Sequence, residues 1–169
     1  IVRAAGELGL EALSLYAFSS ENWKRPEDEI SDLMGLMRSF IKSDIDEFTA
    51  NDVRLKIIGN YRALAPDIVD MLDDALERTA KNSRTTLAVA LNYGSQDELV
   101  RAAQAAAAQG AITAQSIEAN LDTADMPPLD LLIRTSGEQR LSNFMLWQAA
   151  YAEFWFTETL WPDFDQQVF

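Results

Sequence analysis

Short apolar runs alternate with amphipathic stretches along most of the chain. Four of these runs are nearly continuous in apolar residues and end in polar residues or glycine: 13–18, 55–58, 87–91 and 129–133. Such runs are typical of strands that are buried on both faces. A fifth run, 153–159, is richer in aromatic residues. The pattern therefore predicts five strands.

The longest amphipathic stretch follows Pro26, and its acidic residues 27–29 suit the start of a helix. Its apolar positions recur at helical spacing: they are Ile30, Leu33, Met34, Met37, Phe40, Ile41, Ile45 and Phe48. Further helices are predicted over 66–81, 96–108 and 114–121, and residues 1–10 resemble the second half of a helix that ends near Gly9.

Alternation of strands and helices predicts the fold class. We expect one α/β domain over residues 1–169, with a mostly parallel central sheet and helices on both faces. The apolar stripe of the long helix is expected to face Ala17, Val53, Leu55 and Val89 on the sheet. Such a stripe is most often core, but it could also form one wall of a hydrophobic tunnel.

Charge and missing residue types exclude several functions. The 14 Lys and Arg residues against 27 Asp and Glu residues give a net charge of −13, so binding to a nucleic-acid backbone is not expected. The chain has neither histidine nor cysteine, which excludes Ser-His-Asp and Cys-His catalysis, disulfides and the usual zinc sites. Any metal is therefore expected to be a hard ion with oxygen ligands.

No apolar run approaches the ~18 to 20 residues that span a bilayer, and no signal peptide is present. We therefore expect a soluble protein of the cytoplasm.

Polar residues that follow the predicted strands are the candidate site, because ligands of parallel α/β folds bind beyond the carboxyl ends of strands. Residues 18–26, after the first strand, combine hydroxyls, an amide, an indole and two cations. After the fourth strand, Arg134 and Arg140 flank a Ser-Gly turn, and Ser142-Asn143 could cap a following helix. Two guanidinium groups with free backbone N–H groups at a helix N-terminus would form a site for a phosphate or diphosphate.

Less specific interpretations of these segments remain open. Residues 18–26 could be only a capped turn before a helix, and the arginines could simply pair with Glu138 and Glu153. The anion site by itself would also allow a generic sugar-phosphate or nucleotide-binding α/β domain.

The order of four sequence blocks makes the assignment more specific. These blocks are Phe18-Ser19-Ser20-Glu21-Asn22-Trp23-Lys24-Arg25-Pro26, Leu91-Asn92-Tyr93-Gly94, residues 133–144, and Tyr151-Ala152-Glu153-Phe154 with Trp161-Pro162-Asp163-Phe164. In order and approximate spacing they resemble the signature blocks of the cis-prenyltransferases, of the undecaprenyl diphosphate synthase type. The resemblance covers nearly the whole chain.

The resemblance implies an enzyme that condenses isopentenyl diphosphate with an allylic diphosphate such as farnesyl diphosphate. The product would be a long-chain polyprenyl diphosphate with new cis double bonds, a precursor of the undecaprenyl carrier lipid of the cell wall, delivered to the membrane. Mg²⁺ and a homodimer are implied as well. Arg134, Arg140 and Ser142 would hold isopentenyl diphosphate, and Glu153, from the neighbouring subunit, would help to bind Mg²⁺.

The resemblance also assigns roles around the first strand. Residues expected to line the site between the substrates are Ser19, Ser20, Glu21, Trp23 and Arg25, with Glu29 supporting the loop. Asn22 occupies the position described as a proton acceptor in the family. A neutral amide is a poor base, so we expect Asn22 to position a substrate while the released diphosphate takes the proton. The substrate-binding set also includes Phe18, Glu138 and Leu141.

Two features depart from the family pattern. An Asp-Gly-Asn-Gly-Arg-Trp motif, with its strand, is expected upstream of Ile1, and the chain is expected to be inactive without it. Ser95-Gln96 stands where many members have Gly-Arg, and Ser95 is expected to cap the helix that starts at Gln96. A non-catalytic partner subunit is the alternative function. Retention of Arg134, Arg140, Ser142 and Glu153 favours an enzyme.

Overall fold

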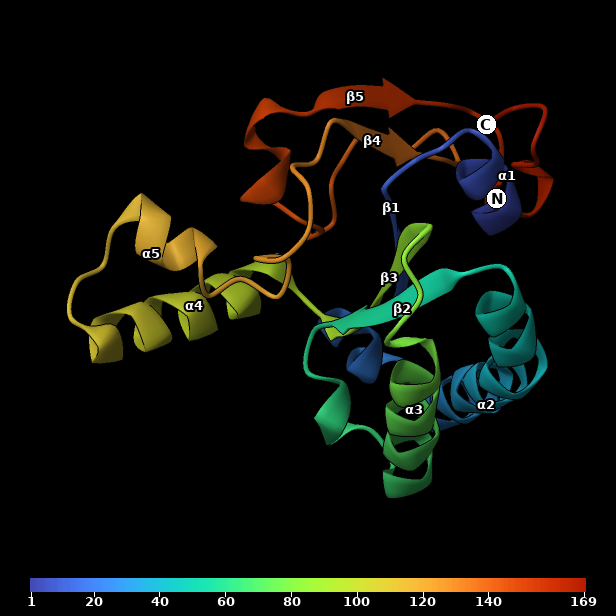
Figure 1. Cartoon of the computed structure of the whole chain (residues 1–169), viewed down its shortest axis with the longest axis horizontal. Helices are drawn as coiled ribbons and strands as arrows, with labels where there is room; N and C mark the ends of the chain where they lie inside the picture. Colours follow the sequence, from blue (N-terminus) through green and yellow to red (C-terminus); the bar gives the residue numbers. More distant parts are fainter. The chain divides into compact units, whose positions relative to one another are not determined.

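The computed structural model describes residues 1–169, which divide into two compact units. The first unit comprises residues 4–93 with Val2, and the second comprises residues 94–169 with Ile1 and Arg3. Figure 1 shows the helices and strands of both.

A three-stranded parallel sheet forms the centre of the first unit (Figure 1). Its strands lie in the order β1 (Ala12–Ser19), β3 (Thr85–Tyr93) and β2 (Val53–Ile58). Strands that run parallel in a sheet need long crossover connections. Here α2 (Glu27–Ala50) connects β1 to β2, and α3 (Pro66–Thr79) connects β2 to β3. These two helices pack on each other and both contact β2. The short helix α1 (Val2–Glu7) precedes β1, and Gly9 follows it with a φ of 76°.

The hydrophobic core of the first unit lies between α2, α3 and the sheet. Met34, Ile41, Ile45 and Phe48 of α2 are buried there, while Phe40 remains 41% exposed. Val53, Leu55 and Val89 belong to the same cluster, so the expectation that they face the α2 stripe is confirmed.

Ala17 does not face this core, because the pairing of β1 with β3 is irregular there. The register runs from Tyr16 opposite Ala90 to Phe18 opposite Leu91, so Ala17 is an extra, unpaired residue. Side chains of a regular strand alternate between faces, and a bulge shifts that alternation by one residue. Phe18, 1% exposed, therefore joins Leu13 and Leu15 on the core face. The expected orientation of Ala17 was wrong for this reason.

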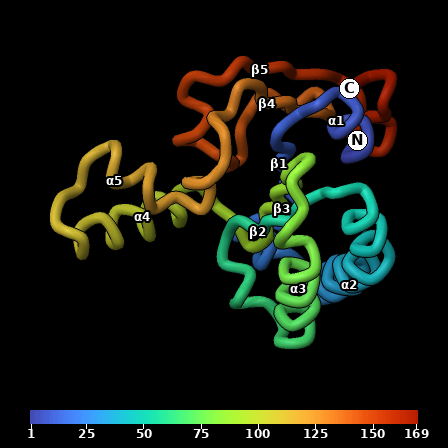
Figure 2. The backbone as a smooth tube through the Cα atoms, in the orientation of Figure 1, coloured from blue at the N-terminus to red at the C-terminus, as the bar shows by residue number.

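The second unit contains α4 (Ser95–Gln109), α5 (Ala114–Glu118), β4 (Leu131–Arg134) and β5 (Glu153–Phe156), which Figure 2 labels. It also contains the 3₁₀ helices η3 (Gln148–Tyr151) and η4 (Trp161–Asp163). β4 and β5 form a parallel two-stranded sheet, with Leu131 opposite Glu153 and Arg134 opposite Phe156.

The α/β class and the parallel pairing of the strands are confirmed, and all five predicted strands are present. They are divided between two sheets. The predicted α-helix after Asn143 is wrong, since residues 142–147 form turns and bends and only η3 follows. None of the helices combines the length and apolar character that crossing a bilayer requires.

Candidate functional site

The 3₁₀ helix η1 (Ser20–Lys24) lies directly after the carboxyl end of β1 and carries the first group of candidate residues. The Asn22 side chain fixes the start of η1, because its Oδ1 accepts a hydrogen bond from the Ser19 N–H at 2.8 Å. This bond uses one lone pair of Oδ1 and orients the amide nitrogen as a donor. This arrangement suits a group that orients a ligand oxygen.

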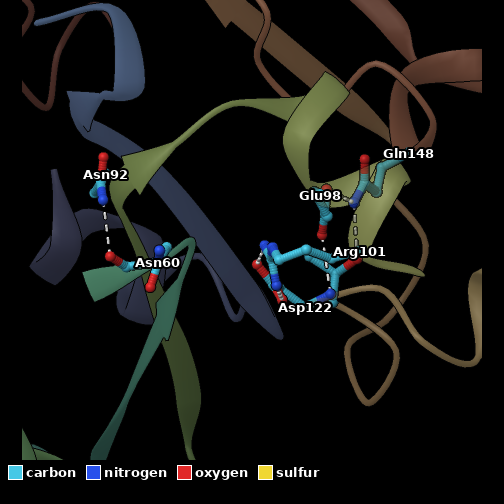
Figure 3. A network of polar contacts seen from close by, with 7 residues as sticks. Asn60, Asn92, Glu98, Arg101, Asp122 and Gln148 are labelled. Atoms are coloured by element: carbon cyan, nitrogen blue, oxygen red, sulfur yellow. Dashed lines mark hydrogen bonds and ion pairs between the residues drawn. The ribbon is translucent and has the colours of Figure 1, made fainter. Parts of the chain in front are cut away.

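Trp23 is held at the edge of the sheet by two contacts. Its indole Nε1–H donates to Asn92 Oδ1 at 2.8 Å, and its ring meets Phe18 edge to face, with centroids 5.2 Å apart. Asn92 in turn donates from Nδ2 to the Asn60 carbonyl at 2.9 Å, and the Asn60 N–H donates to the Asn92 carbonyl at 3.1 Å. Figure 3 shows the side-chain bond between Asn92 and Asn60.

Sequence reasoning gave Asn92 and Asn60 no role, although Asn92 belongs to one of the four blocks. Both follow apolar runs that end in polar residues, at the carboxyl ends of neighbouring parallel strands. That shared position was the available signal. Asn92 also has a φ of 48°, a conformation that asparagine tolerates better than most residues.

A cavity of ≈ 450 Å³ opens beside η1 and the first turn of α2, lined by Trp23, Arg25, Glu27, Ile30 and Ser31. One cation, one carboxylate, one hydroxyl, one indole and one aliphatic side chain thus lie around one space.

Arg25 lies near the carboxylate of Glu29, with Nη1 and Oε2 3.4 Å apart and both side chains 53% exposed. This contact is the one expected of a residue that supports the loop. An exposed pair of this kind is weak and leaves the Arg25 guanidinium able to turn toward a ligand.

Arg134 ends β4 and starts the second group of candidate residues. Its side chain is half-buried and makes no hydrogen bond or ion pair within the chain. The alternative that it pairs with Glu153 is wrong, because Glu153 stands three ladder positions away at the other end of the two-stranded sheet. A half-buried, unpaired guanidinium is an unusual feature, and it fits an anion site.

The backbone after Arg134 differs from the expected anion site. The N–H groups of Ser136 and Gly137 donate to the carbonyls of Thr159 and Thr157, at 2.8 and 2.9 Å. They are therefore not free for a phosphate, and no helix N-terminus follows them. The expected helix N-terminus with free N–H groups is absent, because residues 142–147 form turns and bends. The guanidinium groups remain as the anion-binding groups.

Arg140 forms an ion pair with Glu138 in the same loop. This pairing was one of the alternatives considered for the arginines. The Arg140 side chain is 66% exposed, so the pair is weak and an incoming diphosphate can compete for it.

Ser142 and Leu141 lie in the same loop, Ser142 exposed and Leu141 half-buried. Ser142 has a φ of 50° and is followed by Asn143 at 61°. Ser142-Asn143 was expected to cap a helix that follows it, and no α-helix follows. Asn143 caps α4, with its carbonyl accepting from the Ser95 N–H at 2.8 Å and its Oδ1 from the Gln96 N–H at 2.9 Å. Ser95 therefore does not cap that helix, contrary to the expectation.

No three acidic side chains of the chain lie close enough together to hold a metal ion. Glu153 is exposed at the start of β5 and has no ion-pair partner. Mg²⁺ is commonly held by one or two carboxylates together with substrate phosphates. Glu153 fits the role of one such carboxylate. Within one chain, however, it lies about 10 Å along the sheet from Arg134, at ~3.3 Å per residue.

The chain was compared with known proteins. A family model described as putative undecaprenyl diphosphate synthase matches residues 1–169. Isoprenyl transferase from Agrobacterium fabrum is 53% identical, with 99% of this chain and 71% of the relative aligned. Isoprenyl transferase from Zymomonas mobilis is 52% identical over the same shares.

Two solved structures share the fold. A probable undecaprenyl diphosphate synthase from Campylobacter jejuni superposes with a TM-score of 0.90 at 34% identity, covering 98% of this chain and 79% of that one. Lavandulyl diphosphate synthase from Lavandula x intermedia, in complex with dimethylallyl diphosphate, gives a TM-score of 0.93 at 32% identity, covering 99% and 76%. The chain therefore belongs to the undecaprenyl diphosphate synthase family of prenyltransferases, as the four sequence blocks predicted.

Proposed function

We propose that this protein is a cis-prenyltransferase that condenses isopentenyl diphosphate with an allylic diphosphate, farnesyl diphosphate being the expected primer, to make a long-chain polyprenyl diphosphate. The half-buried, unpaired guanidinium of Arg134 carries the proposal. In a chain of net charge −13, an arginine held without a counter-ion calls for an anionic ligand.

Isopentenyl diphosphate is assigned to the loop after β4. Arg134 and Arg140 contact its diphosphate, and Ser142 donates a hydroxyl. Arg140 exchanges its weak pairing with Glu138 for the ligand, and the half-buried Leu141 lies beside the isoprene unit. Guanidinium groups suit this ligand because they bind phosphate oxygens with two parallel hydrogen bonds.

The allylic substrate is assigned to the cavity beside η1. Arg25 faces its diphosphate, while Trp23 and Ile30 offer apolar surface to the start of its hydrocarbon chain. Ser19, Ser20 and Glu21, at the end of β1 and the start of η1, are assigned to the polar lining of the site. Phe18 is 1% exposed, so its part in the site is to support Trp23.

The reaction breaks the bond between the allylic carbon and its diphosphate and forms a new carbon–carbon bond to isopentenyl diphosphate. Negative charge develops on the leaving diphosphate, and fixed cationic groups stabilise it. Asn22, whose Oδ1 is held by the Ser19 N–H, orients a substrate oxygen through its amide nitrogen. The released diphosphate, a stronger base than an amide, accepts the proton lost from the isopentenyl unit.

Mg²⁺ is assigned to the diphosphate, where it would neutralise charge as the bond breaks. Glu153 contributes one carboxylate ligand from the neighbouring subunit of a homodimer. Its distance along the sheet from Arg134 supports a role in the partner's site. Exposure of 44% for Phe154 and 39% for Phe156 on the same strand supports a subunit contact there. The product would be delivered to the membrane as the precursor of a cell-wall carrier lipid.

The test is an elongation assay on the full-length gene product, with farnesyl diphosphate, labelled isopentenyl diphosphate and Mg²⁺, and products separated by chain length. A ladder of polyprenyl products is expected. Arg134→Ala should lower kcat/KM by about tenfold to a hundredfold, as expected for a lost charged hydrogen bond. Arg78→Ala is the matched control, because Arg78 pairs only with Asp46 and Asp74 at the end of α3.

Failure of the wild-type protein to extend any allylic primer would overturn the proposal. That result would favour the alternative of a non-catalytic partner subunit.

A further inference from the structure

The loop that carries Arg140 and Ser142 continues into a segment with an uncommon backbone. Three non-glycine residues have positive φ within four positions: Ser142 at 50°, Asn143 at 61° and Met145 at 47°. Each such residue costs of order 1–3 kcal/mol, so the conformation persists only where the surroundings enforce it. The question is which contacts of the second unit enforce it.

The first turn of α4 supplies one set of contacts. Asn143 accepts from the N–H groups of Ser95 and Gln96, at 2.8 Å to its carbonyl and 2.9 Å to its Oδ1. The Leu146 N–H donates back to Ser95 Oγ at 3.0 Å. The first N–H groups of a helix have no partner within the helix, so Asn143 satisfies two groups that need acceptors.

Glu98, one turn further along α4, supplies a second contact. Its Oε2 accepts from Gln148 Nε2 at 3.2 Å, and its Oε1 accepts from the Asp122 N–H at 2.9 Å. Figure 3 shows Glu98 between Gln148 and Asp122. Gln148 is the first residue of η3, so Glu98 holds the point where the loop segment ends.

The α4 side chains that make these contacts are buried, which raises the cost of breaking the contacts. Ser95 is 0% and Glu98 1% exposed, and they are two of the four polar side chains buried in the chain, the others being Thr79 and Thr85. A buried carboxylate is costly unless donors satisfy it. The donors Gln148 and Asp122 come from outside α4.

The loop is also fixed at its other end, where Ser136 and Gly137 donate to Thr159 and Thr157. The span 138–142, with Arg140 and Ser142, is therefore held between two anchored points. We infer that Asn143 and Glu98 are positioning residues: they hold this span in its ligand-binding conformation and so set the affinity for isopentenyl diphosphate. The inference rests on the proposed function for the identity of that ligand.

Three variants and one control test the inference. Asn143→Ala removes the side-chain cap and disfavours the positive φ, while Glu98→Leu removes both carboxylate acceptors. Glu98→Gln keeps one acceptor, and Gln148 can rotate its amide so that its Oε1, which is buried without a partner, accepts from the new amide. Gln109→Ala is the control, because Gln109 is the last residue of the same helix and its side chain pairs with Asn120 at 3.1 Å, outside the contacts that hold the loop.

Two readouts separate positioning from a purely structural role. We expect Asn143→Ala and Glu98→Leu to raise the KM for isopentenyl diphosphate about threefold to tenfold, the size of one lost hydrogen bond. The KM for farnesyl diphosphate should change less than twofold. Amide hydrogen exchange at Gln96 and Leu146, whose N–H groups donate in these contacts, should become faster in both variants, and Glu98→Gln should recover most of both properties.

Faster exchange with an unchanged KM would overturn the inference and leave only a structural role. An equal rise of both KM values would also overturn it, as would an equal effect of Gln109→Ala. Absence of any elongation by the wild-type protein would overturn the proposed function instead. The exchange measurement would then still decide whether Asn143 and Glu98 hold the loop. If Glu98→Leu does not fold, Asn143→Ala and Glu98→Gln give the same comparison.

Discussion

Replacement of Asn92 should measure how firmly the sheet edge holds Trp23. Asn92 joins three segments, since its side chain accepts from Trp23 and donates to Asn60. Because its φ is 48°, the free energy of unfolding also depends on how well the replacing residue tolerates the left-handed backbone conformation. Asn92→Ala removes both side-chain hydrogen bonds and leaves a residue that disfavours this φ. Asn92→Gly removes the same bonds without the backbone cost, and Asn92→Asp keeps the acceptor for Trp23.

The magnitude follows from these contacts. The bond to Asn60 should contribute about 1 kcal/mol, and the bond from Trp23, which is 43% exposed, about 0.5 kcal/mol. Alanine in the left-handed region adds about 1 kcal/mol. Asn92→Ala should therefore lower the free energy of unfolding by about 2–3 kcal/mol, Asn92→Gly by about 1–2 kcal/mol, and Asn92→Asp by about 1 kcal/mol.

Urea unfolding monitored by circular dichroism gives these differences, and a loss of 2–3 kcal/mol should shift the midpoint by about 1 M. A double-mutant cycle of Asn92→Ala with Trp23→Phe should return a coupling of about 0.5 kcal/mol for that hydrogen bond. Equal losses for the alanine and glycine variants would refute the backbone argument. A loss below about 0.5 kcal/mol for Asn92→Ala would refute the contributions assigned to the two hydrogen bonds and to the backbone conformation.

Three further predictions concern glycine and charge. Gly59→Ala should destabilise the protein by more than about 3 kcal/mol in urea unfolding, because a Cβ at its φ of 101° would clash with the Leu91 carbonyl oxygen; a smaller loss would mean that β3 can shift. Gly35→Ala, in open space on α2, should stabilise the protein by about 0.5–1 kcal/mol in the same assay, and a loss would contradict the helix-propensity argument. The hydrogen bond from Tyr61 lowers the pKa of Asp73 below its usual range, so its stabilisation is complete above about pH 4 and is lost as pH falls through the lowered pKa. The difference in Tm between wild type and Asp73→Asn should therefore shrink as pH falls below about 4, and a constant difference would contradict the linkage.

The candidate site could be predicted from sequence only where local composition carries the information. The polar segments after the first and fourth apolar runs were found because parallel strands end at one edge of a sheet. The ion pair between Arg140 and Glu138 was foreseeable because only one residue separates them in the chain. Asn60 and Asn92 were missed because their contact joins residues 32 apart, and no local pattern encodes it.

The failed predictions have physical causes of the same kind. Ser142-Asn143 is a good capping sequence, yet Asn143 caps α4, whose first residue precedes it by 48 positions in the chain. Free N–H groups of a helix N-terminus were expected after Arg134, but no α-helix forms there, and the N–H groups of Ser136 and Gly137 donate to the carbonyls of Thr159 and Thr157. In each case a distant segment satisfied a backbone group that local reasoning had left open.

The sequence by itself determined the strands, the helices, the parallel α/β class and the family, because hydrophobic periodicity and contiguous motifs are local properties of a chain. Tertiary structure decided which backbone groups remain available to a ligand. It turned Phe18 into the core through the bulge at Ala17, left Arg134 unpaired, and tied the loop after Arg140 to α4. These outcomes depend on hydrogen bonds and packing between residues far apart in sequence, and only the folded chain brings those residues together.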